Sequence, residues 1–262
     1  GGFIWPGVDY LGEAGWPSKG WPNGLFDICM FEKPRAAYHR AMWNPEPMVR
    51  IAVKDPFADI DHGRDLWQWP SIVDHWNFDG KFNGLVIEVL TTTNCEEVEL
   101  YRNDKLMGRE RAANYTNNTI VWNIPYTPGT LLAKGYNQGK EVAKWEIKTA
   151  GVPASLMAEA DRMEIAGEGQ DWSLISLTLV DKNGVKVQTD NRRISVKVSG
   201  EGRLKALDTG DLRVDSFCRD NVLTYFGQAL LTVQSTRKAG NIRADIQVEG
   251  IDKPFSVMIT TK

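Results

Sequence analysis

Apolar and polar residues alternate along most of the chain after residue 47, in short runs separated by turn residues. Such alternation is typical of β-strands that bury one face. In the first half the predicted strands are 48–53, 85–90, 98–101, 105–107, 119–124, 129–136 and 141–147. In the second half they are 155–159, 173–181, 194–198, 227–234, 241–248 and 255–259. Short strands at this spacing predict two β-sandwiches in tandem.

Two polar stretches interrupt the alternation of apolar and polar residues. Lys182-Asn183-Gly184 is a hairpin signal, because an Asn-Gly pair tolerates the positive φ that a tight turn requires. The polar stretch 55–65 predicts a loop.

Residues 1–46 have a different pattern. A short apolar run ends at Trp5 and is followed by a Pro-Gly turn, which predicts a buried strand that leads into a functional loop. A helix is predicted from Pro34 to Trp43, because proline suits the first turn of a helix. Its predicted apolar face comprises Ala37, Tyr38, Ala41 and Met42. A buried strand needs neighbours on both sides, so we expect these residues to be the last part of a larger domain.

Composition narrows the classes of partner. The formal net charge is -3 and the lysines and arginines are scattered, so neither nucleic acid nor an anionic membrane is a predicted partner. No apolar run approaches the roughly 20 residues that span a bilayer. Cys29, Cys95 and Cys218 are far apart and are predicted to be separate buried thiols. The three histidines lack metal-ligand spacing, so neither a metal nor a cofactor is predicted.

Tryptophan is the unusual component. Seven of the ten tryptophans lie in the first 76 residues, namely Trp5, Trp16, Trp21, Trp43, Trp67, Trp69 and Trp76. Indole rings stack on the apolar faces of sugars, but their large area also makes them ordinary core residues. The count alone leaves both roles open.

The first 43 residues resemble the end of the catalytic barrel of glycoside hydrolase family 2, in the Bacteroides-type β-galactosidase branch. The resemblance rests on Gly-Gly-Phe-Ile-Trp at the start, the run Pro-Gly-Val-Asp-Tyr-Leu-Gly-Glu at 6–13, and Gly-Leu-Phe-Asp at 24–27. Pro6 stands where the family usually has threonine. Residues 93–100, 121–131 and 160–171 resemble the immunoglobulin-like domains that follow the barrel in these enzymes. Asp208-Thr209-Gly210-Asp211 resembles a D-N-G-D turn, with Thr209 as a departure.

The resemblance therefore implies three parts. Residues 1–46 are expected to be the C-terminal remnant of a (β/α)8 barrel, consisting of its last strand, loop and helix. Residues 47–150 and 151–262 are each expected to form an immunoglobulin-like β-sandwich.

Family 2 enzymes are retaining glycosidases, which use two carboxyl groups about 5 Å apart. In the family both are glutamates that precede the segment matching residue 1, so no catalytic residue is expected in this chain, and the chain alone is expected to be inactive. By resemblance, Trp5 forms a wall of the subsite for the released sugar, and Asp9, Glu13 and Trp16 are further candidates for substrate binding. Related barrels often have a cis peptide after this tryptophan, so Trp5–Pro6 is predicted to be cis.

The implied function is part of an exo-acting β-galactosidase, whose sandwiches brace the barrel or mediate assembly. Its implied partners are galactoside-containing oligo- or polysaccharides and the missing N-terminal catalytic domains, and a homo-oligomer is left open. The resemblance implies a periplasmic or extracellular location. An alternative is a module that binds carbohydrate through Trp67, Trp69 or Trp76, and a third is a purely structural module.

Overall fold

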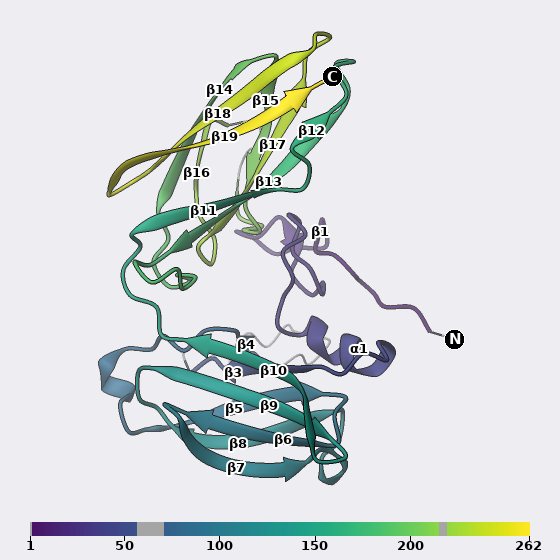
Figure 1. The fold of residues 1–262 in the computed structure, drawn as a ribbon, viewed down its shortest axis with the longest axis vertical. Helices are drawn as coiled ribbons and strands as arrows, with labels where there is room; N and C mark the ends of the chain where they lie inside the picture. The colour runs from purple at the N-terminus through teal and green to yellow at the C-terminus, as the bar shows by residue number, and fades with distance from the viewer. Residues whose placement is uncertain (1, 57–70, 215–218) are drawn as a thin grey trace. The chain divides into compact units, whose positions relative to one another are not determined.

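A computed structural model describes residues 2–56, 71–214 and 219–262 and shows a mainly β protein built from sandwiches (Figure 1). The chain forms two compact units. The first unit comprises Gly1–Val8, Asn23–Phe26 and Glu32–Thr149, and the second comprises Asp9–Pro22, Asp27–Phe31 and Ala150–Lys262. Segments of the first 31 residues therefore belong to both units.

The sandwich of the first unit has two four-stranded antiparallel sheets. One sheet has the order β4 (Ile72–Val73), β3 (Val49–Lys54), β5 (Val86–Thr93) and β8 (Thr119–Pro125). The other has the order β10 (Lys140–Lys148), β9 (Thr130–Asn137), β6 (Glu97–Arg102) and β7 (Lys105–Arg111). The unit also contains α1 (Ala36–Trp43) and two 3-10 turns, Gly80–Phe82 and Ala112–Asn114.

Aromatic side chains occupy the centre of this first core. Trp76 is fully buried and packs edge-on against Phe78 and Tyr126, with ring centroids 5.8 and 4.9 Å away. Its indole N–H donates to the carbonyl oxygen of Thr127 at 2.8 Å. A second indole, that of Trp122, donates to Thr91 Oγ1 at 2.9 Å. Each buried ring thus has a partner for its polar atom, as buried indoles normally do.

The sandwich of the second unit has a four-stranded and a five-stranded sheet. The first has the order β11 (Ser155–Ala160), β13 (Trp172–Val180), β17 (Gln228–Ser235) and β15 (Gly202–Asp208). The second has the order β12 (Glu164–Ile165), β19 (Ile251–Thr261), β18 (Gly240–Val248), β14 (Arg193–Gly200) and β16 (Asn221–Leu223). The buried core between them consists of alanine, valine, leucine and isoleucine side chains.

Every strand predicted after residue 47 is present, with ends that differ by a few residues. The buried strand predicted to end at Trp5 is wrong: residues 2–5 form no strand, and Phe3 and Trp5 are exposed, because the described chain offers no neighbouring strand to pair with them. The predictions missed β15, where a register shift between Leu204 and Ala206 interrupts the alternation. They also missed the strands of two or three residues, which are too short to show an alternation, namely β1 (Tyr10–Leu11), β2 (Gly20–Trp21), β4, β12 and β16. The turn at 182–184 forms, with Gly184 at φ +78°. The residues on its two sides are joined by an isolated antiparallel bridge between Val180 and Lys186, not by a pair of full strands. Of the predicted loop at 55–65, residues 57–65 lie outside the described residues.

The predicted apolar face of the helix is wrong in part. The buried positions of α1 are Ala36, Ala37 and Ala41, whereas the Met42 side chain is exposed. Small alanine side chains let the helix approach its neighbours closely, so they form the packed face. No helix among the described residues has the length and apolar character needed to cross a bilayer.

Candidate functional site

Trp5 lies on an extended segment of the first unit. The carbonyl oxygen of Gly7 accepts from the N–H groups of Leu25 and Phe26 at 2.9 and 3.1 Å, and Val8 bridges to Phe26. These contacts fix the backbone just after Trp5, whose side chain is 67% exposed. The Trp5–Pro6 bond is cis, which confirms the prediction.

Glu13 and Trp16 lie on a small hairpin of the second unit. Its strands are β1 (Tyr10–Leu11) and β2 (Gly20–Trp21), paired Tyr10 to Trp21 and Leu11 to Gly20. The carboxylate of Glu13 accepts a hydrogen bond from the Tyr10 hydroxyl, and Glu13 has φ +47°. Trp16 is 86% exposed and precedes a second cis proline, Pro17. The hairpin thus presents a carboxylate and an indole to solvent.

Asp9 lies at the base of the same hairpin, and its side chain is buried. It is close to Tyr225, whose pKa is raised by burial and by the carboxylates of Asp211, Asp9 and Asp27. The structure therefore brings Asp9, Glu13 and Trp16 together on one hairpin, with Asp9 inside and the other two at the surface. Trp5 belongs to the first unit.

The described tryptophans divide between core and surface. Trp76 and Trp122 are buried and Trp21 is half-buried, while the other described tryptophans are exposed, namely Trp5, Trp16, Trp43, Trp145 and Trp172. The prediction that Trp76 is available to polysaccharide is wrong, because its ring fills the first core. Trp67 and Trp69 lie outside the described residues.

Sequence reasoning missed a group of carboxylates in the second unit. Burial raises the pKa of Asp208 to about 6, and the carboxylates of Asp27 and Asp211 add to this effect. The thiol of Cys29 is buried in the same region, and burial, together with Asp208 and Asp27, raises its pKa. A thiol with a raised pKa is a poor nucleophile. Asp27 and Asp208 both occur in motifs of the resemblance, but their spacing of 181 residues gave no signal of proximity (208 − 27 = 181).

The candidate metal ligands do not form a centre. Among the described residues, no group of three or more His, Cys, Asp or Glu side chains is arranged to hold a metal ion. His39 is half-buried between Tyr38 and Trp43, with ring centroids 5.1 and 4.9 Å away. Burial lowers its pKa.

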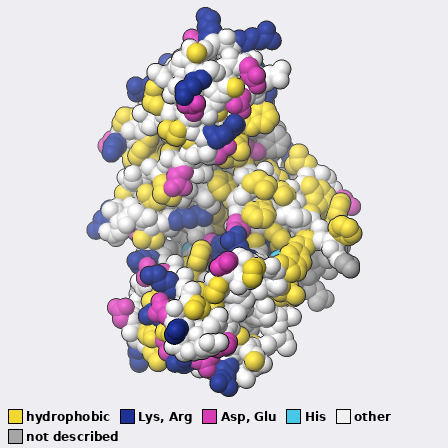
Figure 2. All heavy atoms as spheres, turned by 45° about the vertical axis from the view of Figure 1, so that its right-hand side comes forward, with side chains coloured by type: hydrophobic (Ala, Val, Ile, Leu, Met, Phe, Trp, Pro, Cys, Tyr) yellow, Lys and Arg dark blue, Asp and Glu magenta, His cyan; other side chains and the backbone are white. Residues whose placement is uncertain are grey.

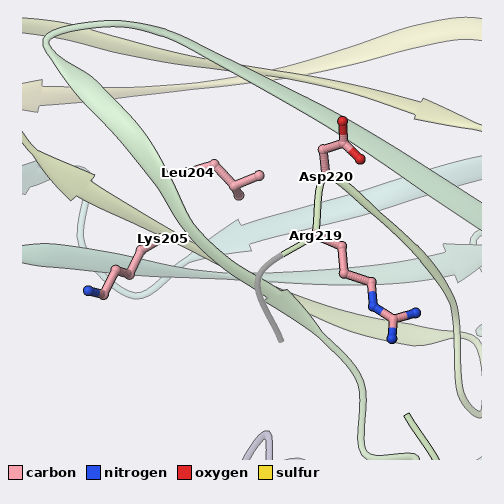
Figure 3. A pocket seen from close by; sticks show the side chains of 4 residues that line it. All are labelled: Leu204, Lys205, Arg219 and Asp220. Atoms are coloured by element: carbon pink, nitrogen blue, oxygen red, sulfur yellow. The ribbon is translucent and has the colours of Figure 1, made fainter. Parts of the chain in front are cut away.

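A pocket in the second unit lies apart from the hairpin residues. Leu204 and Lys205 of β15 line it, together with Arg219 and Asp220 just before β16 (Figure 3). The Lys205 and Arg219 side chains point in different directions, so the charged groups do not converge on one point. No residue predicted to bind substrate lines this pocket.

Charge and apolar character are distributed unevenly over the visible surface. Basic and acidic side chains are interspersed over both sandwiches in Figure 2, without a field of one sign. Apolar side chains group where α1 and the preceding residues reach the surface. In the first unit, the exposed large apolar residues of this part are Phe3, Trp5, Met42 and Trp43.

Two family profiles match the chain. The profile of glycoside hydrolase family 2 C-terminal domain 5 matches residues 156–254. A domain of unknown function, DUF4982, matches residues 84–143. The first match lies within the second sandwich and the other within the first.

Curated relatives and solved structures agree with these matches. The chain is 25% identical over 96% of its length to the β-galactosidase BoGH2A of Bacteroides ovatus, and 26% identical over 80% to a putative β-glucuronidase of Formosa agariphila. It spans only 27% and 19% of those two proteins. A solved glycosyl hydrolase family 2 member from Bacteroides cellulosilyticus superposes with a TM-score of 0.91 at 30% identity, covering 99% of this chain and 36% of that one.

Proposed function

The chain belongs to the C-terminal region of glycoside hydrolase family 2, and on this premise we propose that it completes a retaining exo-glycosidase that removes terminal β-galactosyl units. Its sandwiches brace the catalytic barrel. In the complete protein, the segment that leads to Trp5 pairs with the preceding barrel strands as the last strand, which puts Trp5 at the strand end where barrel active sites lie. The two catalytic glutamates belong to a part of the protein that precedes this chain.

One observation carries this proposal: Trp5 is a surface indole on a backbone segment that its neighbours hold in place. The N–H groups of Leu25 and Phe26 hold the carbonyl of Gly7, two residues beyond Trp5. The indole itself remains 67% exposed. The exposed face of an indole that is held in one place can stack on a ligand. A sugar ring with an apolar face is a suitable occupant.

Other exposed apolar residues of the first unit favour an interface with the remaining barrel. Phe3, Met42 and Trp43 of the first unit are each more than half exposed. Scattered single residues of this kind are normal on a surface, but several within the first 43 residues favour an interface. We infer that the preceding part of the barrel packs on α1 and on the segment before Trp5.

In this proposal the chain binds and positions the sugar, while the preceding part performs the bond cleavage. The Trp5 indole stacks on the galactosyl ring. Glu13, whose carboxylate accepts from the Tyr10 hydroxyl, is a separate candidate for binding a substrate hydroxyl. The named relatives include both a β-galactosidase and a putative β-glucuronidase, so galactose is the finer part of the proposal.

The test uses the full-length protein with 4-nitrophenyl β-galactoside and β-glucuronide. We expect Trp5→Ala to lower kcat/KM for the galactoside by about 100-fold, which corresponds to roughly 2.7 kcal/mol of lost transition-state stabilisation. The matched control is Trp145→Ala, a partly exposed tryptophan of the same unit that lies on β10, outside the predicted site and the inferred barrel interface. Equal activity of Trp5→Ala and wild type would contradict the role of Trp5, and preference for the glucuronide would contradict galactose.

The binding-module alternative has a weaker basis. Trp76 fills the first core and is unavailable to a polysaccharide. Calorimetric titration of the 262-residue chain with galactans and other polysaccharides tests what remains of it. Saturable heat from the chain alone would favour the binding module over the enzyme part.

A further inference from the structure

The hairpin that carries Glu13 and Trp16 is too small to hold its own shape. Its strands β1 and β2 are two residues long and pair only with each other. Isolated two-stranded hairpins are marginal in water even when longer. Its conformation must therefore come from contacts with other parts of the second unit.

The segment Asp208–Val214, which follows β15, provides such contacts. The Lys19 N–H donates to the Leu212 carbonyl at 2.9 Å, and Lys19 Nζ donates to the Val214 carbonyl at 3.2 Å. The buried Leu212 side chain packs on Gly20, where an added Cβ would lie 2.8 Å from Leu212 Cδ2. The second strand of the hairpin thus rests directly on this segment.

A second contact holds the turn that follows the hairpin. Asp27 Oδ1 accepts from the N–H groups of Cys29 and Phe31 at 2.8 and 3.0 Å, which closes the turn Asp27–Phe31. The other oxygen, Oδ2, faces Gly210 so closely that a Cβ on Gly210 would lie 2.0 Å from it. Only a glycine leaves room for this carboxylate.

The segment itself is rigidly built. The Asp211 N–H donates to Thr209 Oγ1 at 3.4 Å, so the threonine hydroxyl serves as the acceptor in this turn. Asp211 in turn binds the Arg213 guanidinium, with 2.8 Å between Oδ1 and Nε and between Oδ2 and Nη2. At its start, Asp208 is paired with Leu230 in the sheet. The hairpin is therefore tied to the framework of the C-terminal sandwich.

We propose that the segment Asp208–Val214 positions the hairpin for sugar binding, with Gly210 and Leu212 as positioning residues for Glu13 and Trp16. This proposal rests on the proposed function. It assigns the C-terminal sandwich a direct part in substrate affinity, through residues that do not touch the sugar.

Gly210→Ala is the sharpest variant. The φ of Gly210 is not positive, so alanine fits its backbone, and the nearest atoms that the added Cβ meets belong to the Asp27 side chain. The matched control is Gly80→Ala, where an added Cβ meets nothing within 4 Å. Asp27→Gly removes the carboxylate and also the Asp27 Cβ, which would lie 2.9 Å from the added Cβ, so Gly210→Ala should have little further effect in that background.

Hydrogen exchange on the 262-residue chain tests the structural part. We expect Gly210→Ala to accelerate exchange of the Lys19, Cys29 and Phe31 amides by about tenfold or more, while amides of β13 and β17 keep their protection. If β13 also loses protection, the variant has unfolded, and Leu212→Ala is used instead. Unchanged exchange at Lys19 in both variants would overturn the proposal.

Kinetics of the full-length protein test the functional part. We expect Gly210→Ala to raise KM for the galactoside about tenfold with kcat changed less, because the displaced hairpin weakens sugar binding. Wild-type protein that hydrolyses no glycoside would refute the proposed function. Active wild type with an unchanged KM in Gly210→Ala, despite faster exchange at Lys19, would refute positioning alone.

Discussion

The two sandwiches share an architecture but have different interiors. The first core centres on Trp76, Trp122 and Tyr126, each with a hydrogen-bond partner for its polar atom. The buried cluster of the second contains only aliphatic side chains. Aromatic rings with polar atoms fit in few orientations, whereas aliphatic side chains mainly need the right volume. We therefore expect the first core to be the less tolerant of substitution.

Buried charge is distributed in the opposite way. The buried carboxylates among the described residues are Asp9, Asp27 and Asp181, and all three belong to the second unit. The same unit contains Asp208, whose pKa burial raises to about 6. In the first unit, hydrogen-bonded aromatic rings fix the packing of the core. In the second unit, carboxylates fix the structure of the loops. The second unit should therefore respond more strongly to pH.

The largest expected effect comes from the aromatic core. Trp76→Ala should lower the free energy of unfolding of the first unit by about 3–5 kcal/mol, because it leaves a cavity and removes the donor to the Thr127 carbonyl. The comparison variant is Leu177→Met in the aliphatic core, where a change that keeps the volume should cost less than about 1.5 kcal/mol. Urea unfolding measures both. A loss below about 1 kcal/mol for Trp76→Ala would contradict the contrast.

The next effect tests a buried carboxylate. Asp181 accepts from the N–H groups of Gly151, Asn183 and Val185 at 2.8–2.9 Å. Burial alone would raise its pKa, but these donors outweigh burial and lower it. Asp181→Ala leaves the donors without their acceptor and should destabilise the second unit by roughly 2–4 kcal/mol in thermal or urea unfolding. Asp181→Asn retains one acceptor oxygen and should therefore lose less stability than Asp181→Ala. An equal or greater loss of stability in Asp181→Asn would contradict this account.

The smallest effect concerns pH. A carboxyl whose folded-state pKa is raised binds its proton more tightly in the folded state. The stability that this proton contributes is present at pH 4 and is lost as pH rises through about 6. Asp208→Asn should flatten this dependence, because asparagine keeps an acceptor for the Thr209 N–H without a charge. The pH dependence of stability is measured from melting temperatures at pH 4.5 and 7, with Asp220→Asn as an exposed control. An unchanged pH dependence would exclude Asp208 as its source.

The sandwiches were predictable because each strand alternates on its own. In β8 and β13, for example, the alternation of buried and exposed positions is visible within a few residues. β15 was missed because its bulge shifts the apolar positions between Leu204 and Ala206. In the helix, three alanines form the buried face, and periodicity weighted toward large residues selected Met42 instead.

The site was predictable only as far as local sequence determines it. The cis bond after Trp5 followed from a short motif. The buried strand predicted to end at Trp5 did not form, because a short apolar run does not show whether neighbouring strands are there to bury it. The burial of Asp9 and the contact of Asp27 with Gly210 depend on residues far along the chain, which no local pattern records. Trp76 shows a further limit, since an indole that stacks on sugar and one that fills a core look the same in sequence.

The pairing of Lys19 with Leu212 has a consequence for biosynthesis. These residues are 193 positions apart (212 − 19 = 193). At 5–20 residues per second, a ribosome needs roughly 10–40 s to make the intervening polypeptide. During that interval the nascent hairpin lacks its support, and its apolar residues remain open to chaperones and proteases. Maturation of this region therefore awaits translation of the final third of the chain.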